Sequence, residues 1–217
     1  MLIGWRRDSF RDSRTRAFEP FAQKSRKIVC VSEVEINCDH VVSWLKHDDP
    51  RFKALCNRMQ TDFADRDYGY RICLHEAAHA LLMELDGLKN VRFYGPEIYY
   101  NFMIDEFGAN GARVHADDQP DAVVDDAYKF MATMHAVAGG VALRKFKGLE
   151  GKAAGDGGDY ADFLRLYRKN PPKNGESADS LWKRAENAVS TRLDDAELKE
   201  MILVRADEYF HQLYPNG

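Results

Sequence analysis

Between Tyr68 and Leu85 the apolar residues recur every three or four positions, which is the period of an α-helix. Asp67 stands directly before this segment and Gly87 shortly after it, where an N-cap residue and a left-handed C-terminal residue are expected. The pattern therefore predicts a helix over residues 68–85.

The rest of the chain shows the helical period in several more places, separated by shorter runs of β-branched and aromatic residues. Helices are predicted over residues 39–46, 50–63, 121–146 and 159–168, and one or two more over 178–213. Strands are predicted over residues 28–36, 91–94, 98–104 and 112–115. Gly139–Gly140 indicates a kink or a close helix crossing, and residues 148–158 are predicted to form a glycine-rich turn. We therefore expect a mainly α fold with a small β-sheet, of the α+β class.

Length and charge fit one domain preceded by a basic segment. The chain has 217 residues, 45% of them hydrophobic, and a net charge of −4. Residues 1–27 contain eight basic and three acidic side chains, a net charge of +5, which leaves −9 for the remainder. We expect a basic N-terminal arm over 1–27 and a single domain over 28–217. Such an arm could contact nucleic acid, a membrane surface or the acidic domain itself, and it has some features of an organellar targeting segment.

The apolar runs and the cysteines bear on where the protein works. No apolar run is long enough to cross a bilayer, and no secretory signal follows the N-terminal arginines. The four cysteines, at positions 30, 38, 56 and 73, form no C-x-x-C pair and no disulfide framework. We expect reduced, mostly buried thiols in a cytoplasmic protein without a membrane span.

The predicted helix 68–85 carries the sequence His-Glu-Ala-Ala-His at residues 75–79, an HExxH pattern. A spacing of four places His75 and His79 on one face, one turn apart, where both can bind one metal ion. Glu76 lies beside that face and can take a proton from a zinc-bound water. In a chain of this composition the pattern arises by chance with a probability on the order of one percent. A catalytic zinc site is therefore favoured over two structural histidines with a solvated glutamate.

A catalytic zinc site needs a third protein ligand and an open position. Leu82 and Leu85 occupy the positions at which metzincins have a glycine and a third histidine, which excludes that class. The remaining candidates are His115, His135, Glu150, Asp156 and Asp159. Asp159 follows a glycine-rich turn at the start of a predicted helix, where it could serve equally as a metal ligand or as an N-cap residue.

Three segments resemble the FtsH-type peptidase domain. Leu74–Leu82 (LHEAAHALL) is similar to the zinc-binding helix of that family, whose motif is HEAGHA. Val137–Phe146 (VAGGVALRKF) resembles its LAGRAAEE helix, and Gly155–Leu164 (GDGGDYADFL) is similar to its TGASNDLKRAT segment. The order of elements matches from about residue 68 to residue 166.

The resemblance implies a zincin-type helical peptidase domain in which Asp159 is the third zinc ligand. The chain departs from the family at Ala78, where the family usually has glycine, and at Leu143 and Arg144, where it has two acidic residues. No Walker A motif and no apolar membrane segment occur in the sequence. The resemblance thus implies the peptidase module alone, without the ATPase and membrane segments.

These observations lead to one main functional hypothesis. We expect a zinc-dependent, ATP-independent metallopeptidase that binds Zn²⁺ through His75, His79 and Asp159. It would hydrolyse a peptide or protein substrate, lying along an edge strand near residues 91–94, through a zinc-bound water activated by Glu76. One alternative is a catalytically silent zincin-like module that serves as a protein- or nucleic-acid-binding scaffold. Another is a zinc hydrolase with a smaller substrate, although the cysteine-bearing segment of peptide deformylase is absent.

Overall fold

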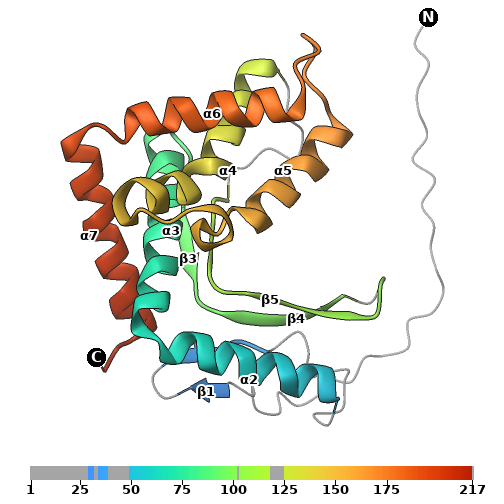
Figure 1. Cartoon of the computed structure of the whole chain (residues 1–217), viewed down its shortest axis with the longest axis vertical. Helices are drawn as coiled ribbons and strands as arrows, with labels where there is room; N and C mark the ends of the chain where they lie inside the picture. The colour runs from blue at the N-terminus through green and yellow to red at the C-terminus, as the bar shows by residue number, and fades with distance from the viewer. Residues whose placement is uncertain (1–28, 32–33, 39–48, 102, 118–124, 217) are drawn as a thin grey trace, which may run out of the picture.

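The computed structural model describes residues 29–31, 34–38, 49–101, 103–117 and 125–216. In these ranges the chain is mostly helical, with a small amount of β-structure, as predicted (Figure 1). The helices are α2 (Pro50–Ala64), α3 (Arg66–Leu85), α4 (Asp126–Lys147), α5 (Asp156–Lys169), α6 (Ala178–Arg192) and α7 (Ala196–Leu213), with one 3-10 helix η1 (Gly151–Ala154). The strands are β1 (Val29–Val31), β2 (Val34–Ile36), β3 (Arg92–Tyr94), β4 (Glu97–Asn101), β5 (Glu106–Asn110) and β6 (Arg113–His115).

Helix α3 lies at the centre of the helical part, packed against α7 on one side and α4 on the other (Figure 1). Helix α7 runs antiparallel to α3. Tyr214, after the end of α7, lies against Gly69 near the start of α3, whereas Arg205 of α7 pairs with Glu84 near the end of α3. Residues 73–83 of α3 are all buried, since they are covered on several sides. Small side chains such as alanine suit this position because they let neighbouring helices approach closely.

The strands form two-stranded antiparallel pairs, β1–β2, β3–β6 and β4–β5. The last two pairs follow one another in a single long hairpin, in which β3 and β4 run out and β5 and β6 return. In Figure 1 the β4–β5 part of this hairpin extends over α2, away from the helical core. Strand β6 packs against α3, so the hairpin borders the central helix.

Helix starts follow the capping residues in the sequence. Asp49, directly before Pro50, accepts a hydrogen bond from a backbone N–H of the first turn of α2. The prediction that Asp67 caps the central helix is wrong, because α3 begins at Arg66 and Asp65 accepts the hydrogen bond from the Asp67 N–H. The C-terminal signal is correct, since α3 ends two residues before Gly87, whose φ is +90°.

Two predicted strands are wrong in detail, because in each the chain reverses its direction. The single strand predicted over 28–36 is two strands, and Val29 of β1 pairs with Ile36 of β2. The strand predicted over 98–104 ends at Asn101, and the chain reverses before returning as β5, which was not predicted. Asp105 in this turn has a left-handed φ of 51°, a conformation that aspartate adopts more readily than β-branched residues do.

The predicted glycine-rich turn over 148–158 is also too long. The 3-10 helix η1 occupies part of it, and α5 begins at Asp156 rather than at Asp159. Asp159 therefore lies inside the first turns of α5, and the N-cap alternative for this residue is wrong, because Gly155 holds that position. The predictions for residues 1–27, 39–46 and 121–124 lie outside the described residues.

Helix α4 passes through Gly139–Gly140 without interruption, and Gly139 marks a close helix crossing. Here α4 lies against the His75 ring of α3, and a Cβ atom at Gly139 would overlap that ring. Any larger side chain at this position would push α4 away from α3. The Gly139 position thus fixes how closely α4 supports the histidine face.

We expect Gly139→Ala to destabilise the protein by about 3 kcal/mol, because overpacking at a fixed helix contact forces backbone shifts. Gly157→Ala is the matched control, since a Cβ atom there meets open space. Urea unfolding of both variants measures the effect through the shift in midpoint. Equal midpoints for Gly139→Ala and the wild type would show that the crossing tolerates a methyl group.

The described part of the chain also bears on the predictions for the cysteines and for membrane-spanning helices. Cys38, Cys56 and Cys73 are buried and form no disulfide bond within the described residues, as expected, and the side chain of Cys30 lies outside those residues. No helix in the described part of the chain has the length and apolar character needed to cross a membrane.

Candidate metal centre

Helix α3 brings the two histidines of the His-Glu-Ala-Ala-His sequence together, one turn apart on a buried face. The Nε2 atoms of His75 and His79 lie 2.9 Å from each other, and the two rings are nearly perpendicular, at 71°. Only 7% of His75 and 5% of His79 is exposed. The helix thus points two imidazole nitrogens at one position, as the spacing predicted.

Helix α5 supplies a carboxylate to the same position. The Asp159 Oδ2 atom lies 3.0 Å from His75 Nε2 and 3.5 Å from His79 Nε2. The three donor atoms lie within 4.8 Å of one another, in the one group of this kind among the described residues. His75, His79 and Asp159 could therefore hold a metal ion.

The distances between these donors suit a small tetrahedral ion. Zinc binds histidine nitrogen and carboxylate oxygen at about 2.0–2.2 Å, so two ligand atoms of a tetrahedral site are roughly 3.3 Å apart. The separations of 2.9, 3.0 and 3.5 Å bracket this value. The described residues supply three donors, and a tetrahedral ion held by three protein donors keeps a fourth position open, as catalytic zinc sites do.

Neighbouring groups fix the orientation of the histidine rings. His79 Nδ1 lies 2.6 Å from the backbone carbonyl oxygen of His135 in α4, so Nδ1 donates and Nε2 presents its lone pair. His75 Nδ1 is buried and has no hydrogen-bond partner among the described residues. Gly155, before α5, lies so close that a Cβ atom there would be 3.2 Å from this nitrogen. The two rings are thus enclosed by α4 and by the start of α5.

This arrangement requires a positive charge between the donors. Two neutral Nε2 lone pairs at 2.9 Å beside a carboxylate repel one another unless a cation or a proton lies between them. Burial lowers the pKa of His79, but the Asp159 carboxylate outweighs this and raises it to about 9. Burial acts to raise the pKa of Asp159, yet the two histidines bring it below its usual range. In the metal-free site a proton therefore takes the place of the cation.

Glu76 lies next to the three donors and is buried. Burial raises the pKa of its carboxyl group, and the nearby histidines oppose this effect. The backbone N–H of Val114 in β6 also interacts with the carboxylate. A buried carboxylate with a raised pKa, close to a metal position, is suited to accept and return protons near neutral pH.

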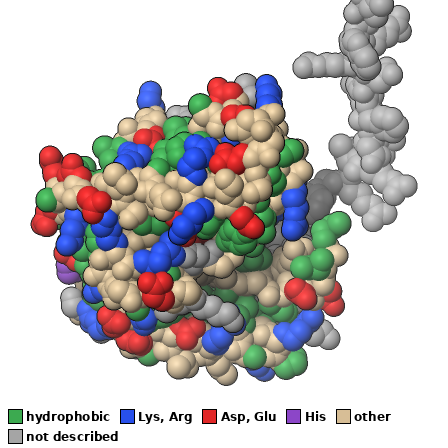
Figure 2. Space-filling view, turned by 45° about the horizontal axis from the view of Figure 1, so that its top comes forward, with side chains coloured by type: hydrophobic (Ala, Val, Ile, Leu, Met, Phe, Trp, Pro, Cys, Tyr) green, Lys and Arg blue, Asp and Glu red, His purple; other side chains and the backbone are tan. Residues whose placement is uncertain are grey.

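The site opens into a cleft of about 1120 Å³. One wall is α3, along which the lining residues extend from Tyr68 through the histidines to Met83, and the opposite wall is the hairpin segment from Ala109 to His115. Helices α4 and α5 contribute most of the remaining lining residues, including His135 and Asp159. Figure 2 shows a hollow on the right of the molecule with hydrophobic side chains in it.

The other ligand candidates are not part of the group. His135 Nε2 lies 2.9 Å from Asp86 Oδ2, so its side chain is held by this carboxylate. His115 lines the cleft from β6, and Glu150 is exposed. The side chain of Asp156 lies outside the described residues.

Sequence reasoning missed the groups that surround the ligands. The His135 carbonyl and the Val114 N–H are backbone atoms, so no side-chain pattern could indicate them. Asp86 holds the His135 ring and also accepts a hydrogen bond from Arg192 in α6, a contact across 106 residues. These partners depend on how the helices pack, which a local motif does not contain.

Comparison with known proteins gives no further guide to the site, because no family model and no curated protein matches the chain. The geometry of the donors and their surroundings is therefore the basis for a functional assignment.

The affinity of the metal-free protein for Zn²⁺ should rise with pH. Below about pH 9 the metal must displace the proton that Asp159 stabilises on His79, so the apparent Kd should fall about tenfold per pH unit. Competition with a chromophoric chelator between about pH 6 and 8 measures this slope. Asp159→Asn should flatten it, because the charge that holds the proton is removed. A pH-independent Kd in the wild type would contradict the shared-proton arrangement.

Proposed function

We propose that the chain is a zinc-dependent, ATP-independent metallopeptidase of the FtsH type. The observation that carries the proposal is that two imidazole nitrogens and a carboxylate meet beside the buried Glu76. Of these donors, His75 and Asp159 are 84 residues apart in the sequence. Four separate requirements of a zinc peptidase coincide here: three donors, an open position, a general base and a cleft.

Zinc is the metal that this donor set favours, since imidazole and carboxylate with an open fourth position are the ligands of catalytic zinc. When bound, zinc supplies Lewis-acid polarisation of the scissile carbonyl and lowers the pKa of water. His75, His79 and Asp159 would hold it. The His135 carbonyl keeps the His79 ring in the tautomer that leaves Nε2 free for the metal.

Glu76 carries the proton transfers in this proposal. Its carboxylate takes a proton from the attacking water and returns it to the nitrogen of the leaving amine. Burial raises the pKa of Glu76, and a raised pKa helps the carboxylate hold that proton between the two steps. Only 9% of Glu76 is exposed, so its contact with bulk water is small.

The substrate in this proposal is an extended peptide or an unfolded protein segment. The cleft is lined by residues of β4, β5 and β6, including all three residues of β6, and not by residues 91–94, near which the sequence predicts the substrate; residues 92–94 form β3, which pairs with β6. The substrate therefore lies along β6 and can form backbone hydrogen bonds there, as peptides do at sheet edges. We place the activity in the cytoplasm, because the four cysteines of the sequence form no C-x-x-C pair and no disulfide framework.

Hydrolysis of an unstructured protein such as casein, by the purified chain loaded with Zn²⁺, tests the proposal. The comparison is with Glu76→Gln, which keeps the size of the side chain and the metal ligands. Cleavage by the wild type alone supports a metallopeptidase. Equal cleavage by both proteins would contradict the proposal. If zinc binding has been demonstrated and neither protein cleaves the substrate, the result contradicts the proposal as well and favours a non-catalytic zinc module.

A further inference from the structure

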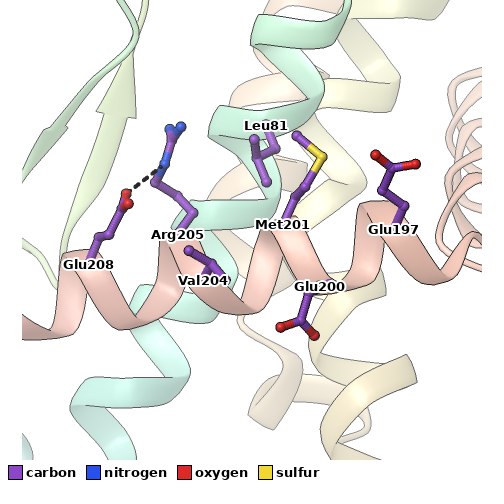
Figure 3. A pocket seen from close by; sticks show the side chains of 7 residues that line it. All are labelled: Leu81, Glu197, Glu200, Met201, Val204, Arg205 and Glu208. Atoms are coloured by element: carbon purple, nitrogen blue, oxygen red, sulfur yellow. Dashed lines mark ion pairs between the residues drawn. The ribbon is translucent and has the colours of Figure 1, made fainter.

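The outer side of α3 and α7 carries an apolar hollow that shares no lining residue with the metal cleft. Leu81 of α3 and Met201 and Val204 of α7 form its apolar part (Figure 3). An adjoining hollow continues along the same side to Leu85 and Leu198. The two have volumes of about 290 and 500 Å³. We call this surface the α3–α7 face.

Three neighbouring apolar side chains on this face are open to solvent. Leu85 is 52% exposed, Met201 41% and Val204 49%. A single exposed apolar residue is ordinary, but adjoining ones over a hollow mark a surface that another group covers. The occupant of the α3–α7 face should therefore present apolar side chains of its own.

The rim of the face is acidic. Its acidic residues are Asp195, Glu197, Glu200 and Glu208. The two arginines there are already engaged, because Arg192 pairs with Asp86 and Arg205 with Glu84 and Glu208. In Figure 3 Glu197 and Glu200 extend from α7 without an ion pair among the residues drawn. The occupant should therefore carry positive charge as well as apolar side chains.

We propose that the α3–α7 face binds residues 1–27 of the same chain. This segment has a net charge of +5 and contains the large apolar residues Trp5, Phe10, Phe18 and Phe21. It thus offers both properties that the face requires. A second copy of the face is a poor partner because its acidic rim would repel the first, and an anionic membrane surface is disfavoured for the same reason.

Residues 1–27 are long enough to reach the α3–α7 face of their own molecule from the start of β1. Strand β1, which begins at Val29, packs against α2. Tyr214, at the end of α7, donates a hydrogen bond to the Phe63 carbonyl of α2, so the end of α7 also lies beside α2. Met201 lies about 20 Å from Tyr214 along α7, at 1.5 Å per residue. The residues before Val29 can span up to about 90 Å when extended.

Limited trypsin digestion of the full chain tests this binding, since the segment contains eight cleavage sites. Cleavage of a bound segment tracks the fraction that is transiently released. The test variant is Met201→Asp combined with Val204→Asp, which places charge in the hollow. Met103→Asp is the control, because Met103 is 91% exposed in the turn between β4 and β5. Mass spectrometry follows the loss of residues 1–27 in low salt.

We expect the double variant to lose the segment about tenfold faster than the wild type and the control. Glu197→Gln with Glu200→Gln, which leaves the apolar contacts intact, should also accelerate cleavage and reduce its salt dependence. Equal rates in the wild type and both double variants would overturn the proposal. So would a protection that appears only at high protein concentration, because the face would then bind a neighbouring copy.

Discussion

Purified protein supplied with zinc should carry close to one Zn²⁺ ion per chain, and His79→Ala should carry close to none. His79 contributes one of three donors, and its Nε2 lies within 3.5 Å of both others. Its loss leaves two donors, which hold zinc too weakly to survive dialysis. We expect Asp159→Asn to bind zinc about 10- to 100-fold more weakly rather than to lose it, because an amide oxygen remains at the same place. Elemental analysis after dialysis measures each stoichiometry.

Two controls separate loss of metal from loss of fold. His115→Ala removes a histidine that lines the cleft but does not belong to the donor group, and it should keep its zinc. Circular dichroism should show a similar helical content for Asp159→Asn and the wild type, because Asp159 is partly exposed in α5. Stoichiometric zinc in His79→Ala would place the metal elsewhere. An unchanged affinity in Asp159→Asn would give the third ligand role to another acid.

Glu76→Gln should lower kcat/KM for peptide hydrolysis by about 10²- to 10⁴-fold, while zinc stays bound. A general base contributes about 10²- to 10⁴-fold, and glutamine cannot accept the proton. Since Glu76 is next to the ligand group but not part of it, the zinc stoichiometry should not change. Initial rates with a fluorogenic peptide, measured beside elemental analysis of the same sample, test both halves of this expectation.

A second acid in the cleft provides the control for Glu76. Asp162 also lines the cleft from α5, but its Oδ1 atom pairs with Arg165 and the residue is largely exposed. Asp162→Asn should keep most of the activity. If Glu76→Gln retained hydrolysis, Glu76 would not be the base, and a merely structural role for the His-Glu-Ala-Ala-His sequence would gain support.

The elements around the site could be predicted where sequence periodicity and burial agree. Helices α2 and α3 were predicted to within two residues, because proline or glycine marks an end and apolar residues repeat regularly. The turn before Glu106 was missed because Met103 and Ile104 look like strand residues, although both are exposed. What reverses the chain there is the left-handed conformation of Asp105, and hydropathy does not report it.

The site itself could be predicted only in part from the residues. His75 and His79 are brought together by one helix, so their spacing is sufficient to place them on one face. Asp159 depends on the packing of α5 against α4, and the residues alone left several candidates open; the family resemblance singled it out. The glycines before Asp159 indicated a turn, yet Gly157 and Gly158 lie in the first turn of α5.

The 84-residue separation between His75 and Asp159 has a consequence for synthesis. A ribosome that has made α3 and α4 has released both histidines and Glu76, but not the carboxylate that completes the group. A nascent chain, or a fragment that stops before α5, therefore holds only two of the three donors. In the proposed peptidase, activity would therefore become possible only after α5 has been translated, and the emerging chain and its neighbours on the ribosome would be protected from premature cleavage until then.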